Sequence, residues 1–290
     1  MTLSDKESGN NMVNKISVVI ITYNRNKDCM EAVNSILMQR KPPHEIIVID
    51  DASPMPFQFK NSKVKVIRNR VEQGLAISRN IGIQSSTGDI IAFIDDDALA
   101  PPDWCEKLQK AFSIGADVVG GPCKPLYLSL PPKWWDEKRF GILVGISING
   151  IIGCNFAVKR ETFNKVGYFN SRLGRKSRKL ISNEETEFFQ RVEKVGGKII
   201  FDKELEVYHK ISQNRLTLYY LLRRAWYDGI SECIMYSKVK HIRKTFGCFK
   251  RLVVFSIKML LDRKNLRYYL VKIVAQLGFI FGIFIESMYS

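Results

Sequence analysis

The sequence predicts an α/β fold in which a mostly parallel sheet is flanked by helices. Short apolar runs rich in β-branched residues alternate with longer segments that carry apolar residues at helical spacing. Crossover segments of that length join parallel strands and place helices on both faces of the sheet. The run Ile90–Ile94 is apolar throughout, which is typical of a strand buried on both faces.

The other elements follow in a regular order. The first 14 residues are polar, and we expect them to be disordered. The first strand leads into a helix, for which we expect Met30, Val33, Ile36 and Leu37 on one buried face. Strands are expected at residues 16–21, 45–49, 64–67, 90–94, 116–119, 153–158 and 198–201, and further helices at residues 73–84 and from residue 183 onwards.

Composition limits the class of protein. A chain of 290 residues can hold one large domain, or a core domain with a smaller appendage. The net charge of +16 calls for an anionic partner. The six cysteines lie far apart without a Cys-x-x-Cys pair, and the polar N-terminus lacks the apolar core of a signal peptide. These features predict a reducing, cytoplasmic location.

Carboxylates follow two of the predicted core strands. Asp95, Asp96 and Asp97 come directly after residue 94, and Asp50 and Asp51 follow the strand at residues 45–49. Open α/β sheets bind ligands beyond the carboxyl ends of their strands, and Mg²⁺ is held by carboxylates together with substrate phosphates. An acidic loop that caps the next helix would explain one such cluster. Because two strands share the pattern, we favour a metal–diphosphate site.

The C-terminal part changes character. Between Lys238 and Lys272 there are 11 Lys or Arg residues against one acid, Asp262, which gives a net charge of +10. Apolar residues are interspersed with them, as in a helix that lies on an anionic membrane. The apolar segment at residues 273–285 falls short of the roughly 20 residues that span a bilayer. We therefore expect peripheral attachment to the cytoplasmic face. Nucleic acid is not the expected partner, because it would not explain the apolar end.

Six stretches in this order resemble the family-2 glycosyltransferases, enzymes of the GT-A type with a Rossmann-like sheet that use nucleotide-diphosphate sugars. Four of them belong to the donor side, and the resemblance spans roughly residues 15 to 230. Residues 153–156 and 183–187 resemble the acceptor-side motifs, and His209 resembles a late histidine close to the metal. The donor-side stretches are residues 18–25, 48–53, 79–82 and 88–97.

The resemblance implies roles for individual residues. Tyr23 would stack on the nucleotide base and Asp51 would hydrogen-bond it. Asp95 and Asp96 would contact ribose and phosphate, and Asp97 would ligate the metal with His209 beside it. The remaining residues assigned to the donor site are Thr22, Asn24, Arg25 and Arg79.

The expected general base lies in the cluster Asn183-Glu184-Glu185-Thr186-Glu187. Glu185 stands where the family usually has an aspartate, and Asn183 replaces a glycine. Glutamate is one methylene longer, so Glu184 and Glu187 stay open as alternatives. Independently of the resemblance, acidic residues suit a helix N-terminus.

The resemblance thus implies an inverting, metal-dependent hexosyltransferase that uses Mg²⁺ or Mn²⁺ and a UDP-sugar, the family default. The acceptor would be a glycan or glycolipid in cell-surface polysaccharide or glycolipid synthesis. The expected organisation is a donor-binding half at residues 15–120, an acceptor-binding half at 121–215 and a basic, apolar helical region at 216–290. The alternatives are a nucleotidyltransferase and a non-catalytic basic protein that binds membrane or nucleic acid.

Overall fold

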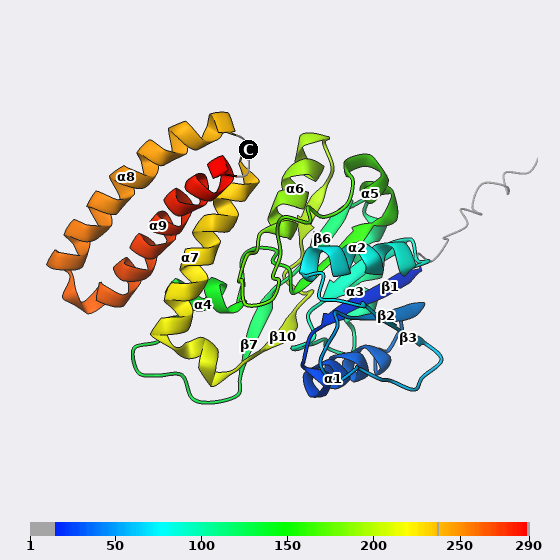
Figure 1. Ribbon diagram of the computed structural model, residues 1–290. Coiled ribbons are helices and arrows are strands. Elements are labelled where there is room, and N and C mark those ends of the chain that lie inside the picture. The colour runs from blue at the N-terminus through cyan, green and yellow to red at the C-terminus, as the bar shows by residue number, and fades with distance from the viewer. Residues whose placement is uncertain (1–14, 237, 289–290) are drawn as a thin grey trace, which may run out of the picture.

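The computed structural model describes residues 15–236 and 238–288, so the expected disorder of residues 1–14 lies outside the described residues. Across these residues, seven strands form one sheet in the order β3-β2-β1-β4-β8-β6-β9 (Figure 1). Neighbouring strands run parallel except that β8 is antiparallel to β4 and to β6. The predicted mostly parallel α/β sheet is confirmed. The bounds are β1 (Ile16–Thr22), β2 (Glu45–Asp50), β3 (Val64–Arg68), β4 (Ile90–Ile94), β6 (Val118–Gly120), β8 (Asn155–Lys159) and β9 (Ile199–Phe201).

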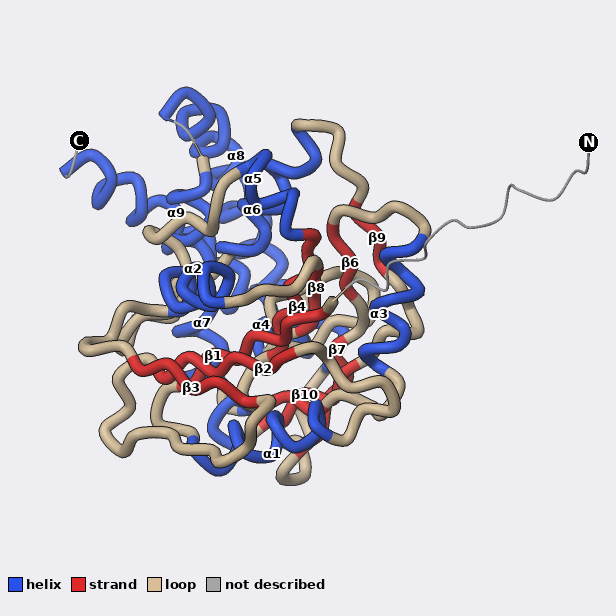
Figure 2. Tube along the Cα trace, turned by 90° about the vertical axis from the view of Figure 1, so that its right-hand side faces the viewer, coloured by secondary structure: helices blue, strands red, loops and turns tan. Residues whose placement is uncertain are grey.

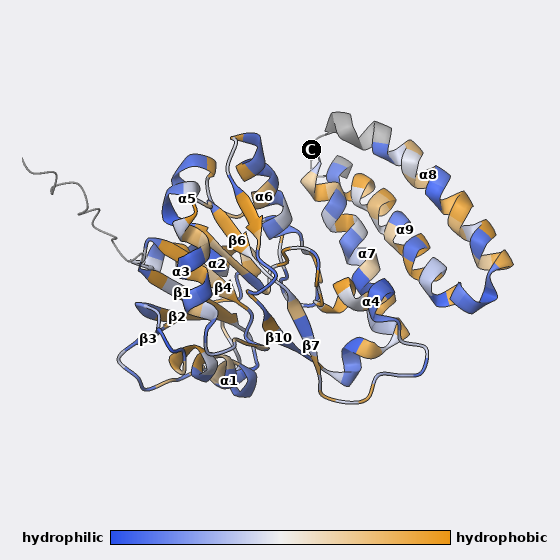
Figure 3. Cartoon of the chain, turned by 180° about the vertical axis from the view of Figure 1, so that it is seen from behind, coloured by the Kyte–Doolittle hydropathy of each residue, from blue (hydrophilic) through white to orange (hydrophobic). Residues whose placement is uncertain are grey.

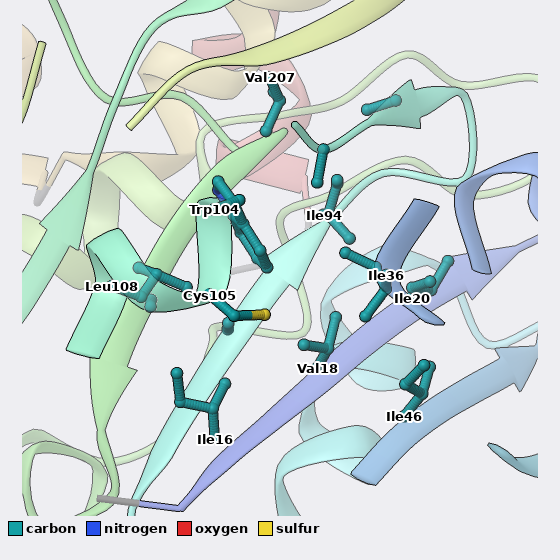
Figure 4. Packing of buried hydrophobic residues seen from close by; sticks show 14 of the residues in the cluster. Ile16, Val18, Ile20, Ile36, Ile46, Ile94, Trp104, Cys105, Leu108 and Val207 are labelled. Atoms are coloured by element: carbon teal, nitrogen blue, oxygen red, sulfur yellow. The ribbon is translucent and has the colours of Figure 1, made fainter. Parts of the chain in front are cut away.

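Helices cover both faces of this sheet, because alternate residues of each core strand point to opposite sides. Val18 and Ile20 of β1 pack with the first core cluster, which includes residues of α1 (Asn26–Leu37) and α3 (Trp104–Ser113). Figure 4 shows Trp104 beside the end of β4 in this cluster. Val19 packs in a second cluster, with residues of α2 (Leu75–Ser85), α5 (Arg160–Val166) and α6 (Glu184–Lys194). Every residue of β4 is buried, as predicted.

A smaller sheet stands beside the large one (Figure 2). In it, β10 (Val207–Ile211) lies between β5 (Ala98–Leu99) and β7 (Cys123–Tyr127). Because β5 begins directly after Asp97, pairing of His209 with Ala98 brings β10 next to the end of β4. The helix α4 (Glu137–Val144) follows β7, and the rings of Trp134 and Trp135 pack against Phe140 of this helix.

Three long helices complete the described chain: α7 (Leu218–Met235), α8 (Lys238–Leu261) and α9 (Leu266–Met288). The turns η1 (Gln213–Leu216) and η2 (Arg263–Asn265) precede α7 and α9. Helix α9 lies between α7 and α8, with α8 on the outside (Figure 1). Helices α7 and α9 approach very closely, since a Cβ on Gly278 would lie 2.1 Å from the carbonyl oxygen of Trp226.

Helix α9 is longer than the apolar segment expected from the sequence. The segment at residues 266–272 joins residues 273–285 in one helix, because no proline or glycine interrupts it before Gly278. Within the described residues, Arg263–Glu286 is the one helical stretch long and apolar enough to cross a membrane.

Candidate active site

The site lies where β1, β2 and β4 end, at one edge of the large sheet. Parallel pairing aligns Thr22 with Asp50 and Val19 with Phe93, so the residues that follow these strands converge. A cavity of about 470 Å³ opens there. The predicted site residues that line it are Tyr23, Arg25, Asp51, Arg79, Asp95, Asp96, Asp97, Glu184, Glu185 and His209. Thr22 and Asn24 lie directly beside Tyr23, and Asn24 adopts a left-handed backbone (φ +55°).

Asp51 is buried and holds the loop before α2. Its carboxylate accepts hydrogen bonds from the backbone N–H of Gln73 and Gly74, both at 2.8 Å, and from the side-chain amide of Asn69 at 2.7 Å. The backbone at Ala52 is left-handed (φ +64°), which turns the chain away directly after Asp51. Asp51 therefore already supports the cavity wall at the place where the resemblance puts a nucleotide base.

The three adjacent aspartates have different surroundings. Asp96 is buried, accepts a hydrogen bond from Thr22 Oγ1 at 2.8 Å and lies 3.2 Å from Arg25 Nη1. Burial raises its pKa to about 7, with Asp97 adding to the shift and Arg25 opposing it. Asp95 is the most accessible of the three at its side chain and points into the cavity.

Asp97 sits among cationic partners. Its Oδ2 lies 2.6 Å from Arg25 Nη1 and 2.6 Å from Arg215 Nη2, and its Oδ1 lies 3.0 Å from His209 Nε2. Burial alone would raise the pKa of Asp97, but His209, Arg215 and Arg25 outweigh it and hold that pKa well below its usual range. The carboxylate therefore stays charged.

His209 is oriented as metal-ligating histidines are. Its Nδ1 lies 3.0 Å from the carbonyl oxygen of Gly145, so the ring donates there and leaves Nε2 facing Asp97 Oδ1. Arg215 Nη1 lies 3.1 Å from this Nε2, so the ring nitrogen accepts a hydrogen bond from the guanidinium that also pairs with Asp97. Only glycine fits at position 145, because a Cβ there would come within 2.4 Å of His209 Cε1. Asp97 and His209 thus offer a carboxylate oxygen and an imidazole nitrogen side by side, which are donor types that divalent cations accept.

A fully buried pair separates the aspartates from the acidic helix. Arg79 is 1% exposed, lies 2.6 Å from Glu184 and donates to the carbonyl oxygen of Gly153 at 2.7 Å. Its guanidinium also lies 5.4 Å from the ring centre of Phe156, with two further rings nearby. Glu184 is therefore held in a buried ion pair with Arg79.

Glu185 differs from the other two glutamates of α6. It is half-buried in the cavity wall and accepts a hydrogen bond from the Gly153 backbone N–H at 3.2 Å. Burial and the charge of Glu184 raise its pKa to about 7, against the opposing effect of Arg79. Glu187 instead pairs with Arg191 at 2.9 Å. Of the three glutamates, Glu185 alone offers a cavity-facing carboxylate without a full ion pair.

Two features of the site were not assigned from the sequence. Arg175, in the basic segment 171–179, lines the cavity. Burial lowers its pKa, but Tyr220, Asp95 and Asp97 outweigh burial and keep that pKa raised. Cys154 also lines the cavity, with its sulfur close to Asp95 and His209. The run of basic residues at 171–179 signalled the first of these, whereas Cys154 lies in the stretch 153–156 that resembles an acceptor-side motif but had no role of its own assigned.

The sheet order and the helices on both faces of the sheet define a fold of the GT-A class. Two solved structures share this fold. The mannosyltransferase PcManGT from Pyrobaculum calidifontis, in complex with GDP-Man and Mn²⁺, aligns with a TM-score of 0.62 at 16% identity, over 94% of this chain and 87% of that one. GalNAc-T7 with UDP, GalNAc and Mn²⁺ aligns with a TM-score of 0.56 at 19% identity, over 77% of this chain and 51% of that one.

Sequence comparison identifies the family. The model of glycosyl transferase family 2 matches residues 17–170. A glucosyl-dolichyl phosphate glucuronosyltransferase of Haloferax volcanii is 31% identical over 76% of this chain and 77% of its own. The succinoglycan biosynthesis protein ExoM of Rhizobium meliloti is 28% identical over 74% of this chain and 72% of its own. The chain belongs to glycosyltransferase family 2 and is a glycosyltransferase.

Proposed function

We propose that this enzyme transfers a hexose, with inversion, from a nucleotide-diphosphate sugar to a hydroxyl group of a lipid-linked or glycan acceptor at the cytoplasmic face of a membrane. The observation that carries the proposal is that two kinds of group line one cavity. Asp95, Asp97 and His209 line it together with Glu185, a carboxylate that has no full ion pair. The similarity to an enzyme named for a glucosyl-dolichyl phosphate acceptor supports a glycolipid, and that to ExoM supports a polysaccharide.

The donor would lie along the ends of β1, β2 and β4. Tyr23, 43% exposed, is free to stack on a base, and Asp51 lies beside it in the cavity wall. Arg25 and Arg175 face the aspartates and offer charge for a diphosphate. Asp97 and His209, with Asp95, would hold a divalent cation. When bound, that cation neutralises charge on the departing diphosphate.

Glu185 would take the proton from the acceptor hydroxyl as the oxygen attacks the anomeric carbon. A raised pKa suits a base that works near neutral pH. Arg79 holds Glu184 and Gly153, and Gly153 in turn donates to Glu185, so the buried pair keeps the base in place. Attack from the side opposite the leaving group inverts the anomeric configuration, by the geometry that separates inverting from retaining glycosidases.

The test is nucleotide binding by the full-length protein, measured by calorimetry with UDP and GDP. We expect one of the two to bind, and Mn²⁺ to tighten that binding, because the cation links the carboxylates to the diphosphate. Binding of neither nucleotide with Mn²⁺ present contradicts the proposal and favours a non-catalytic basic protein.

The activity should depend on pH through Glu185. The base works only when ionised, and its pKa is raised to about 7 by burial and by Glu184. We therefore expect kcat/KM to rise with pH through a limb near pH 7 and to fall as Glu185 becomes protonated below it. Glu185→Asp should move this limb, whereas a limb that arises from Asp96 would stay. A profile that is flat from about pH 5.5 to 8 contradicts the assignment.

The membrane attachment would use the outer face of α8. Phe246, Val253 and Leu260 are seven residues apart, so they lie on one face, and they are 75%, 59% and 73% exposed. Figure 3 shows apolar residues spread along the described part of α8. Phe249 and Ile257 extend the same apolar face. Arg251 and Lys258 on this helix supply positive charge, which suits an anionic bilayer surface. Because α9 packs tightly on α7, surface contact through α8 leaves the helical layer intact.

Binding to anionic vesicles tests this surface. We expect the combined substitution Phe246→Gln, Val253→Gln and Leu260→Gln to weaken vesicle binding by at least about 100-fold, since each buried apolar side chain contributes about 1.5–3 kcal/mol. The wild type should also bind more weakly as salt rises.

The control for the vesicle experiment changes three apolar residues that are similarly exposed but lie far from α8. These are Met38→Gln, Met55→Gln and Ile114→Gln. Equal loss in both triple variants, or salt-insensitive binding that only detergent reverses, contradicts surface attachment through α8.

A further inference from the structure

We propose that Cys154 supplies a sulfur ligand to the cation of this site, so that the enzyme prefers thiophilic divalent cations over Mg²⁺. The inference rests on the proposed metal-dependent function and specifies the chemistry of its cation. It concerns three side chains that converge in the cavity, namely those of Asp95, Cys154 and His209.

The three side chains come from separate parts of the fold. Asp95 follows β4, Cys154 directly precedes β8 and His209 lies in β10. One ligand atom from each, a carboxylate oxygen, the Sγ and a ring nitrogen, all lie within 4.8 Å of one another. The antiparallel pairing of Ile94 with Asn155 fixes Cys154 next to the aspartates. The pairing of His209 with Ala98 fixes the histidine on the other side.

A second observation points to a ligand rather than to a merely buried thiol. The ring of His209 is held by the carbonyl oxygen of Gly145 at Nδ1, which is the outer support that metal-ligating histidines have. Glycine at position 145 leaves room for that ring. The ring is thus fixed with Nε2 3.0 Å from Asp97 Oδ1 and 3.1 Å from Arg215 Nη1, so a cation that binds there takes the place of that guanidinium contact.

The donor set determines which cations fit. Oxygen ligands alone suit Mg²⁺ and Mn²⁺, whereas a thiolate favours softer cations such as Zn²⁺ and Co²⁺. A coordinating thiol loses its proton to solvent when the metal binds. The bond formed is therefore metal to sulfur, and no oxidant is involved. Affinity should follow the order Zn²⁺ above Co²⁺ above Mn²⁺ above Mg²⁺, and the Cys154 sulfur should account for much of the gap at the soft end.

The probe is Co²⁺, added to the full-length, metal-free protein without substrate. Sulfur ligation gives a charge-transfer absorption in the near ultraviolet that oxygen and nitrogen ligands do not give. We expect this band at one equivalent of Co²⁺ in the wild type, and its loss in Cys154→Ala and Cys154→Ser. Calorimetry should show Zn²⁺ affinity lowered by at least about tenfold in both variants, with Mg²⁺ affinity changed much less.

Cys123 provides the matched control, because it is also buried and its thiol contacts that of Cys154. Cys123→Ala should keep the band, and thermal denaturation of all variants checks that they fold. Absence of the band in the wild type, or its persistence in Cys154→Ala, overturns the inference.

The outcome separates this inference from the proposed function. Co²⁺ ligation by sulfur in a protein that binds no nucleotide would refute the function and leave the metal site standing. Mn²⁺-dependent transfer with no sulfur band and with unchanged Zn²⁺ affinity in Cys154→Ala would refute the role of Cys154 and leave the function standing.

Discussion

Glu185→Gln is expected to lower the turnover number by roughly 10²–10⁴-fold, the usual contribution of a positioned general base. The amide keeps the side chain's size and can still accept the hydrogen bond from Gly153, but it cannot take the acceptor's proton. Donor affinity should hardly change, because Asp95, Asp97 and His209 are untouched. Steady-state kinetics and donor binding, measured on one preparation, separate the two effects.

Glu187→Gln is the matched control, since Glu187 lies two residues away on the same helix and pairs with Arg191. It should turn over at close to the wild-type rate. An inactive Glu187→Gln enzyme together with a normal Glu185→Gln enzyme would show that the base is assigned to the wrong glutamate.

The stability of Glu185→Gln distinguishes lost chemistry from lost folding. The pKa of Glu185 is raised from 4.5 to about 7 on folding, so the folded state binds more protons than the unfolded state between these values. The ionisation of Glu185 therefore lowers the free energy of unfolding. This loss is absent below pH 4.5 and fully present above pH 7. Glu185→Gln removes this loss, and the variant should be at least as stable as the wild type at pH 8.

Glu184→Ala is expected to destabilise the fold by about 3–5 kcal/mol, the usual cost of breaking a buried ion pair. The side chains of Arg79 and Glu184 are 2% and 4% exposed, so the substitution leaves the buried guanidinium with the longer, 3.5 Å contact to Asp95 as its carboxylate contact. Urea unfolding, with the midpoint read at constant slope, measures the change.

Glu187→Ala serves as the comparison for stability. Its pair with Arg191 is of the i,i+4 type with side chains 18% and 25% exposed, and such pairs contribute about 0.3–0.5 kcal/mol. Equal losses in Glu184→Ala and Glu187→Ala would mean that the buried pair with Arg79 does not hold the two halves of the site together.

Much of the fold was predictable because the strands are short, apolar and buried on both faces. Ile90–Ile94 has no other stable place than the middle of a covered sheet, and the carboxylates after it follow from that placement. The first helix shows the limit of such patterns. Met30 was expected on its buried face but is 45% exposed, because the smaller Cys29 and Ala32 face the sheet instead.

The candidate site was predictable in position but not in its electrostatics. Asp97 has no cationic neighbour in the sequence, yet Arg25 and Arg215 reach it across 72 and 118 residues. Glu184 and Glu185 are adjacent in sequence, and only the direction of each side chain separates an ion-paired carboxylate from one that faces the cavity. Such distinctions depend on long-range packing, which local spacing does not encode.

The most direct measurement is the release of nucleotide diphosphate from a panel of nucleotide-diphosphate sugars by the full-length enzyme, with Mn²⁺ and a lipid-linked or glycan acceptor. We expect one donor to release its diphosphate in an acceptor-dependent reaction that chelation stops. The new glycosidic bond should have the opposite anomeric configuration by NMR. Release of pyrophosphate with transfer of a nucleotide, or a product that retains the donor's configuration, would contradict this expectation.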